Sequence, residues 1–445
     1  MKGGRSRTRE HQFIHTRRQD ESGIWYALDN AGTIMPSVTD DIVSSLFRFE
    51  AELDAPVDIQ ALREALKRTV RRMPYFNVRL RRGIFWYYFE QCSDDPPVFP
   101  DSPSPCQQWD IRKAEARMFR TRASGSVIAV EFSHALTDGT GGLTFFKTLL
   151  ANYFLVQGVD PGADPSASEW KDILLEGRPS PQEFEDAYQR YFPKGLPAPD
   201  QSPKAFHLQS KLLPRGTYRV ISGELSTQDA LKEARHRGVS LTELLTAVYL
   251  DTLQQLWLAS PVKESSIAVE VPINLRLLFP SPTMRNFSLF VIIKEDMRLG
   301  ARSFDELVKR THYQMKLEYD RMSIAKHLSR NAGSARNLAV RLVPLVVKDL
   351  AARMLFSKFG ESMLSGWISN IGQVTMPPGF ASRIERFGFI PAPSRTTMTN
   401  ASVISWGDRL VIAFGSLAES RDMERLFFTR LRQLGLTVSV RCRLD

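Results

Sequence analysis

A twelve-residue stretch, Glu131 to Gly142, constrains the fold of this chain more than any other part of its sequence. It follows an apolar run, Val127 to Val130, that predicts a buried strand, and it precedes an apolar run, Leu143 to Val156, that predicts a buried helix. The chain must therefore end a strand, turn and begin a helix within this stretch. Turns of this kind place polar side chains at the rim of a rigid scaffold, where functional residues concentrate.

The polar side chains of this turn belong to His134 and, four residues later, to Asp138, which Gly139 follows directly. Three interpretations of His134 compete. The first is a buried histidine that is satisfied by local hydrogen bonds. The second, a metal ligand, needs another His or Cys at ligand spacing; none lies nearby, so we expect no metal site. The spacing of histidine, aspartate and glycine in a strand-to-helix turn favours the third, a general base that takes a proton near neutral pH.

The segment from His134 to Gly139 resembles the HxxxDG motif of the acyltransferase superfamily that is similar to chloramphenicol acetyltransferase. That superfamily includes plant CoA-dependent (BAHD) acyltransferases, alcohol acetyltransferases and the condensation domains of nonribosomal peptide synthetases. Pro272 to Arg276 resembles the family's proline-asparagine-arginine segment, and Ser369 to Gly372 resembles its Ser-Asn-x-Gly segment. The resemblance extends in element order over nearly all of the chain, and HxxxDG is its one sharp motif.

The resemblance implies an α/β (α+β) fold of two chloramphenicol-acetyltransferase-like domains. Each domain is a mixed sheet flanked by helices, and the active site lies in a tunnel between the two. It also implies transfer of an acyl group, which we expect to be acetyl, from a CoA thioester to a small-molecule hydroxyl or amine acceptor. Acetyl-CoA or another acyl-CoA is then a co-substrate, and we expect no bound cofactor.

The resemblance further assigns roles to single residues. His134 takes the proton of the acceptor, while Asp138 and Gly139 shape the loop, with Arg276 as the partner of Asp138 and Arg285 as second choice. The remaining candidates are donors to the oxyanion or to the substrate, namely Ser369, Asn370 and Asn274. No covalent nucleophile is needed, and the chain contains no Gly-x-Ser-x-Gly elbow.

Two departures from the family pattern bear on the acyl donor. Ser133 stands where condensation domains usually carry a second histidine, and the Asp-Phe-Gly-Trp motif of plant-type acyltransferases is missing. Both favour a free-standing enzyme similar to alcohol acetyltransferases. A stand-alone condensation enzyme that forms an amide or ester from a carrier-protein thioester is the first alternative. The second is a non-catalytic binding member of the fold, against which the presence of His134 and Asp138 argues.

The length of the chain, 445 residues, predicts two domains of roughly 200 residues each. We expect a flexible basic tail over residues 1–22 and an N-terminal domain over 23–160 that carries HxxxDG. A proline-rich crossover follows over 161–205, as a plain connector or as a lid along the cleft, and residues 206–445 form the C-terminal domain. Hydrophobic residues make up 43% of the chain and charged residues 24%, which is ordinary for a folded protein.

The net charge of +10 is compatible with a phosphate-bearing partner such as CoA, but no nucleic-acid motif accompanies it, so we expect no nucleic acid. Neither a long apolar run nor an apolar signal core is present, and the three cysteines are widely spaced. We therefore expect a cytoplasmic monomer without disulfides. The basic amphipathic segment Leu338 to Phe359 raises membrane contact as a minority alternative, and packing on the domain is the expectation.

Local patterns place several helix starts. Asp58 is a candidate N-cap, and Ser240 with Glu243 three residues later forms a candidate capping box. The periodicity from Ser303 to Met322 predicts one long amphipathic helix.

Overall fold

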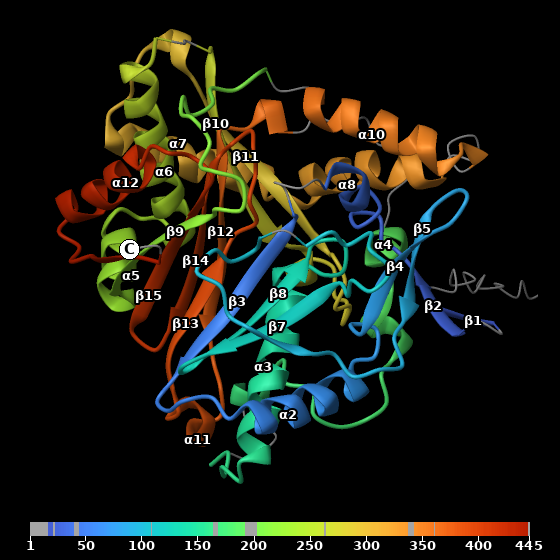
Figure 1. The fold of residues 1–445 in the computed structure, drawn as a ribbon. Coiled ribbons are helices and arrows are strands. Elements are labelled where there is room, and N and C mark those ends of the chain that lie inside the picture. The colour runs from blue at the N-terminus through green and yellow to red at the C-terminus, as the bar shows by residue number, and fades with distance from the viewer. Residues whose placement is uncertain are drawn as a thin grey trace, which may run out of the picture.

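The computed structural model describes residues 17–20, 23–39, 44–107, 109–162, 168–191, 203–261, 264–336, 342–359 and 361–443. In these residues the chain forms three β-sheets flanked by helices (Figure 1). This mixed α/β architecture confirms the fold class expected from the sequence.

Two sheets belong mainly to the N-terminal half. A four-stranded antiparallel sheet has the order β1-β2-β5-β4, and a five-stranded sheet has the order β13-β3-β8-β7-β6. Helices α2 and α3 pack against each other beside the second sheet (Figure 1). The strands and helices of this half are β1 (Arg17–Asp20), β2 (Gly23–Ala27), α1 (Met35–Val38), β3 (Leu46–Leu53), α2 (Ile59–Arg72), β4 (Val78–Arg82), β5 (Tyr87–Gln91), β6 (Val98–Pro100), β7 (Phe119–Ser124), β8 (Val127–Ser133) and α3 (Gly139–Val156).

The described part of the crossover contains three short helical segments. They are η1 (Ser168–Trp170), η2 (Pro181–Phe184) and α4 (Ala187–Tyr191). Glu183 in η2 binds the N-terminal half, because its carboxylate accepts from Arg72 Nη1 at 2.9 Å and from the Tyr75 hydroxyl at 2.7 Å. Its carbonyl accepts from the backbone N–H of Met284 at 2.7 Å. The described part of the crossover is thus bonded to both halves.

The C-terminal half is built on a seven-stranded sheet of order β11-β10-β12-β14-β15-β9-β16. β12 is parallel to both of its neighbours, and the other pairs are antiparallel. The elements are β9 (Arg219–Ser226), α5 (Thr227–His236), α6 (Leu241–Ala259), β10 (Ser266–Asn274), η3 (Leu275–Leu277), β11 (Ser288–Asp296), η4 (Met297–Leu299), α7 (Phe304–Glu318), α8 (Arg321–Arg336), α10 (Leu345–Phe359), η5 (Glu361–Met363), β12 (Gly366–Val374), α11 (Pro378–Ala381), β13 (Ile384–Ile390), β14 (Thr399–Trp406), β15 (Arg409–Ser416), α12 (Asp422–Gln433) and β16 (Ser439–Cys442).

Local capping decides where several helices begin. The Asp58 carboxylate accepts from the backbone N–H groups of Gln60 and Ala61, and both bonds of the Ser240–Glu243 capping box form. These bonds satisfy N–H groups that the first turn of a helix leaves without partners. Both start predictions are confirmed.

Two local expectations differ from the structure. The predicted helix from Ser303 to Met322 is divided, because the Asp320 carboxylate accepts from the N–H groups of Met322 and Ser323 and so starts α8 as a separate helix. In addition, Arg17–Asp20, which lies inside the expected tail, forms β1 and pairs with β2. The rest of the tail, residues 1–16 and 21–22, lies outside the described residues.

Strand β13 joins the two halves. It follows β12 of the C-terminal half in the chain, yet it pairs antiparallel with β3 in the sheet of the N-terminal half. A second link lies near the C-terminus, where the guanidinium of Arg443 donates to Glu50 and Asp101, each at 2.7 Å. The same two carboxylates accept from the fully buried Arg48. The halves are therefore joined by a shared sheet and by a buried ionic cluster.

Candidate functional site

The turn that carries His134 is built as its sequence requires. β8 ends at Ser133, residues 134–136 form the turn, and α3 begins at Gly139 with Asp138 as its N-cap. The Asp138 Oδ1 atom accepts from the backbone N–H of Gly141 at 3.0 Å. The backbone N–H of His134 donates to the carbonyl of Ser45 at 2.9 Å. The histidine thus sits at the junction of a strand end and a helix start, with its backbone fixed.

Asp138 links this turn to the C-terminal half. Its Oδ2 atom accepts from Arg276 Nη1 and from the backbone N–H of Phe287, both at 2.8 Å. The carboxylate is nearly fully buried and has its three bonds to N–H donors, so its negative charge is satisfied without water. The remaining N–H groups of Arg276 donate to the carbonyls of Thr283 and Arg285. The Asp138–Arg276 pair therefore holds the loop of residues 283–287 against the start of α3.

Arg285, the second candidate partner of Asp138, points elsewhere. Its guanidinium donates to the carbonyl of Ala27 and interacts electrostatically with Asp29.

The close approach of this loop explains one glycine. A Cβ on Gly141 would lie 2.1 Å from the Met284 carbonyl oxygen and 2.3 Å from Thr137 Oγ1. Thr137 Oγ1 itself donates to that carbonyl at 2.5 Å. Only glycine lets the loop and the first turn of α3 come this close.

The ring of His134 is oriented by Asn286. His134 Nδ1 lies 3.3 Å from Asn286 Oδ1, and Asn286 Nδ2 donates to the His134 carbonyl at 3.0 Å. Asn286 Nδ2 also faces both carboxylate oxygens of the buried Asp29, at 3.2 and 3.0 Å. Because these partners of Nδ2 are all acceptors, the amide has one orientation, and Oδ1 faces the histidine. Nδ1 must then carry the proton, which leaves a lone pair on Nε2.

Burial lowers the pKa of His134, against the opposing effects of its bond to Asn286 and of the charge on Asp138. Burial raises the pKa of Asp29 to about 6, although Arg285 opposes the change. A lowered pKa keeps the imidazole neutral at pH 7, which is the form that accepts a proton. Geometry and protonation state therefore both suit a general base whose Nε2 takes the proton.

Searches with the sequence found no match among family models or curated proteins. Solved structures match the chain over nearly its full length. The protein TRI101 of F. graminearum, in complex with Coenzyme A and deoxynivalenol, has a TM-score of 0.61 at 13% identity, with 92% of this chain and 98% of that chain covered. A trichothecene 15-O-acetyltransferase from Fusarium sporotrichioides has a TM-score of 0.59 at 10% identity, with 95% and 97% covered. The first condensation domain of the calcium-dependent antibiotic synthetase has a TM-score of 0.59 at 14% identity, with 93% and 96% covered.

The chain has the fold of the acyltransferases that resemble chloramphenicol acetyltransferase and of condensation domains. The resemblance stated from HxxxDG is thus confirmed at the level of fold. In this acyltransferase-condensation fold, the candidate site is built from both halves. The His134 turn comes from one half, and the expected Arg276 and the unexpected Asn286 come from the other.

The three expected donors differ in their surroundings. Asn274 caps η3, because its Oδ1 accepts from the backbone N–H of Arg276 at 3.0 Å. Asn370 shapes an irregularity in β12: its Nδ2 donates to Thr242 Oγ1, and its Oδ1 accepts from the N–H of Gly372, whose φ is +84°. Ser369 precedes this irregularity at the register position opposite Ser402.

The same irregularity brings β12 to the HxxxDG segment. A Cβ on Gly139 would lie 2.9 Å from Ile371 Cδ1. Ile371 therefore packs on the first residue of α3, and the Ser-Asn-x-Gly segment and HxxxDG lie side by side across the two halves.

Asn286 and Asp29 were not among the residues expected from the sequence. Asn286 lies 152 positions from His134, and Asp29 lies 257 positions from Asn286. Asparagine and aspartate are common in loops, so neither stands out by type or spacing. The sequence feature that could have identified Asn286 is its position, just before an apolar strand and ten residues after Arg276.

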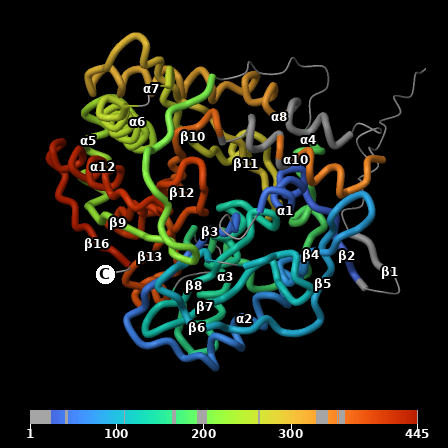
Figure 2. Tube along the Cα trace, turned by 45° about the horizontal axis from the view of Figure 1, so that its top comes forward, coloured from blue at the N-terminus to red at the C-terminus, as the bar shows by residue number. Residues whose placement is uncertain are grey.

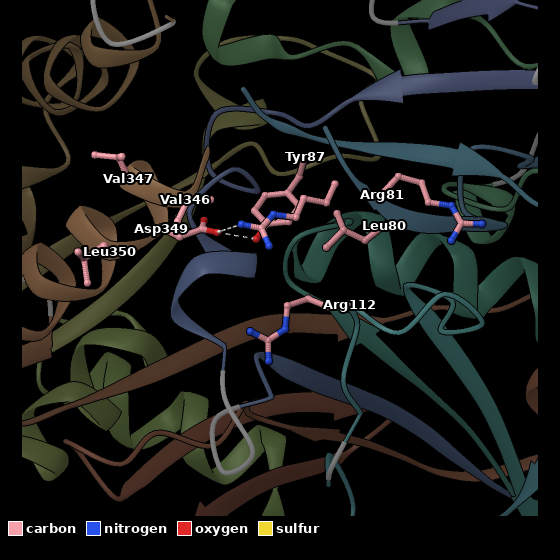
Figure 3. Close-up of a pocket in the computed structure, with 9 residues that line it drawn as sticks. Leu80, Arg81, Tyr87, Arg112, Val346, Val347, Asp349 and Leu350 are labelled. Atoms are coloured by element: carbon pink, nitrogen blue, oxygen red, sulfur yellow. Dashed lines mark hydrogen bonds and ion pairs between the residues drawn. The ribbon is translucent and has the colours of Figure 1, made fainter. Parts of the chain in front are cut away.

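Two surface cavities lie outside this site. One, of about 570 Å³, is lined by residues of the β4–β5 hairpin, Arg112 and α10 (Figure 3). The other, of about 390 Å³, is lined by residues such as Lys294, Asp296 and Arg298. Neither lining includes His134 or Asn286.

Proposed function

We propose that this protein transfers an acyl group from a thioester to a hydroxyl or amine acceptor, with His134 as the general base. The observation that supports it most is the orientation of His134 by Asn286. This orientation leaves a lone pair on Nε2 of a neutral ring. The fold shared with acyltransferases and condensation domains is the second support.

The reaction needs no covalent intermediate on the protein. The acceptor hydroxyl or amine gives its proton to His134 Nε2 while its oxygen or nitrogen attacks the thioester carbonyl. The tetrahedral intermediate then expels the thiolate, which takes the proton back from the imidazolium. General base catalysis of this kind contributes about 100- to 10,000-fold to the rate.

The developing oxyanion needs a hydrogen-bond donor, and we assign this role to Ser369. Asn274 and Asn370 are engaged in capping η3 and in shaping β12, and we propose that they position the site. Loss of one oxyanion donor costs on the order of 3 kcal/mol of transition-state stabilisation. Ser369→Ala is therefore expected to lower kcat by roughly 100-fold.

Our proposed donor is an acyl-CoA, with acetyl-CoA the first to test, and our proposed acceptor is a small molecule. The proposed enzyme works as a monomer, without a metal. A carrier-protein thioester is the second candidate donor, because the condensation domain matches with a TM-score close to those of the other two structures. Ser133 disfavours it: its Oγ accepts from the N–H of Ala135 at 3.3 Å, in the place of a second imidazole.

The test measures thiol release from acetyl-CoA and longer acyl-CoAs with a panel of alcohols and amines. Acceptor-dependent release is expected, and His134→Ala should lower it by about 100- to 10,000-fold. His312→Ala is the matched control, since His312 lies on α7 and bonds to Glu243 outside the site. Full activity in a folded His134→Ala variant would refute the role of His134. Thiol release only from carrier-protein thioesters would show that such a thioester, and not an acyl-CoA, is the donor.

A further inference from the structure

Helix α10 belongs to the C-terminal half in sequence, but it packs on the N-terminal half. It lies beside α1 and the β4–β5 hairpin (Figures 1 and 2). The backbone N–H of Leu345 donates to the carbonyl of Ile84, and Lys348 Nζ donates to that of Phe85, both at 2.9 Å. The helix and the hairpin tip therefore form one continuous surface.

The outward face of this surface is apolar. Five side chains in or just before α10 are each 55% to 66% exposed, and two more lie on the hairpin tip, with Ile84 77% exposed. From the sequence we expected this segment to pack on the domain, but packing accounts for one side of α10 only. We call these seven residues the apolar surface: Ile84, Trp86, Leu342, Val346, Val347, Leu350 and Met354.

The segment that contains α10 is basic in sequence. Residues 336–359 contain five basic residues, at positions 336, 341, 348, 353 and 358, and a single acidic one, Asp349. Asp349 has its side chain 14% exposed at the cavity wall, and it accepts from Ser37 Oγ at 2.6 Å and from the Tyr87 hydroxyl at 2.9 Å. Lys348 Nζ lies 5.7 Å from the centre of the Trp86 ring. A basic segment with an exposed apolar face is typical of helices that lie in a membrane interface.

The larger cavity opens beside the apolar surface. Val346, Val347 and Leu350 contribute to its wall, and Figure 3 shows α10 and the hairpin on its two sides, with Asp349 and Tyr87 turned toward each other. Arg81, Arg82 and Arg112 also line the cavity, and their guanidinium groups pair with the carboxylates of Glu90, Asp349 and Asp110, respectively. Alkyl groups next to guanidinium groups suit the chain and the phosphate of one anionic lipid.

We propose that the apolar surface docks this protein on a bilayer that contains anionic lipids. In the described part of the chain no helix is long and apolar enough to cross a bilayer, so the contact is peripheral. The occupant is chosen by charge complementarity, since residues 336–359 carry five basic residues and one acidic residue, and that one, Asp349, is bonded to Ser37 and Tyr87. The proposal is independent of the acyl transfer proposed above.

The test is flotation of the full chain with vesicles of phosphatidylcholine alone and of equal parts phosphatidylcholine and phosphatidylglycerol. Binding is expected to the second vesicle and to weaken as salt is raised, because salt screens the basic residues. The double variant Val346→Glu/Leu350→Glu should lower the partition coefficient at least about tenfold. Both residues are exposed, so the change should leave the unfolding temperature nearly unchanged.

The matched control, Leu258→Glu/Leu299→Glu, introduces two glutamates at leucines that are similarly exposed but lie outside the apolar surface. It should bind as the wild type does. No binding to either vesicle, or binding that the Val346/Leu350 variant retains, overturns the proposal.

Light scattering measures the oligomeric state of the same variants in parallel. A concentration-dependent dimer that this variant abolishes, in the absence of vesicle binding, would assign the surface to a second copy of the chain instead.

Discussion

At the scale of single residues, Asn286 determines what His134 can do. A histidine acts as a base only through a ring nitrogen that carries a lone pair, and the hydrogen bond at the other nitrogen fixes which one that is. Asp29 holds the Asn286 amide, and the amide holds the ring. Asn286 and Asp29 are therefore positioning residues that act through His134.

The first prediction concerns Asn286→Ala. We expect kcat to fall roughly 10- to 100-fold with a smaller change in KM, because the ring loses its orientation while the substrate contacts remain. Steady-state kinetics on the folded variant measure this split. Asn152→Ala is the control, since Asn152 is a buried asparagine whose Nδ2 donates to Thr69 Oγ1 away from the site. Equal kcat losses in the two variants would contradict the positioning role.

The second prediction concerns pH and Asp186. Burial, together with the charge of Asp29, raises the pKa of Asp186 from 3.8 to about 7. A carboxyl group whose pKa is raised by folding stabilises the native state fully below its unfolded pKa, and this contribution is lost as pH rises through the folded value. Asp186→Asn should therefore gain stability relative to the wild type between pH 5 and pH 8, on the order of 1–3 kcal/mol.

Urea unfolding of the wild type and Asp186→Asn at these two pH values measures the difference. Asp422→Asn is the control of opposite sign, because a hydrogen bond from the Arg425 side chain lowers the pKa of Asp422. Its stability relative to the wild type should not rise with pH. A pH-independent difference for Asp186→Asn would show that the carboxyl group does not titrate in this range.

At the scale of elements, the start of α3 contacts two segments of the C-terminal half. The loop of residues 283–287 lies on its first turn, and Ile371 of β12 packs on Gly139. Capping by Asp138 and the small size of Gly141 are both needed for this approach. The start of α3 thus holds the two halves in contact and also contains residues of the candidate site.

The third prediction concerns Gly141→Ala. The added Cβ meets the Met284 carbonyl, a backbone group that cannot move alone, so we expect a loss of about 1–3 kcal/mol in the free energy of unfolding. Gly139→Ala, two residues earlier in the same turn, is the matched control, because its Cβ meets only the flexible end of Ile371. Chemical denaturation compares the two variants. A Gly141→Ala variant as stable as Gly139→Ala would contradict the close approach.

At the scale of the whole molecule, a few long-range contacts join the halves. β13 extends the N-terminal sheet, Arg443 binds Glu50 and Asp101, and Arg276 binds Asp138. The last of these contacts lies at the candidate site. Stability and site geometry are therefore coupled through it.

The fourth prediction concerns Asp138→Ala. It leaves the guanidinium of Arg276, whose side chain is only 11% exposed, without its counter-charge, so we expect a loss of about 3–5 kcal/mol in the free energy of unfolding and a loss of activity. Glu64→Ala is the control, because Glu64 pairs with Arg68 on the surface of α2, where solvent screening leaves such a pair little effect on stability. Urea unfolding distinguishes the two. An equally small effect of both variants would contradict the linking role of Asp138.

The sequence alone determined the local structure of this protein. The strand, turn and helix around His134 and the helix starts at Asp58 and Ser240 follow from periodicity and from capping bonds that span three or four residues. Such bonds form wherever the pattern occurs, so the pattern predicts them. Tertiary structure decided the rest: Asn286 as the partner of His134, the place of β13 in the other half's sheet, and the exposed face of α10. Each of these depends on how distant segments pack, and the same residue types in loops, strands and helices are compatible with many such packings.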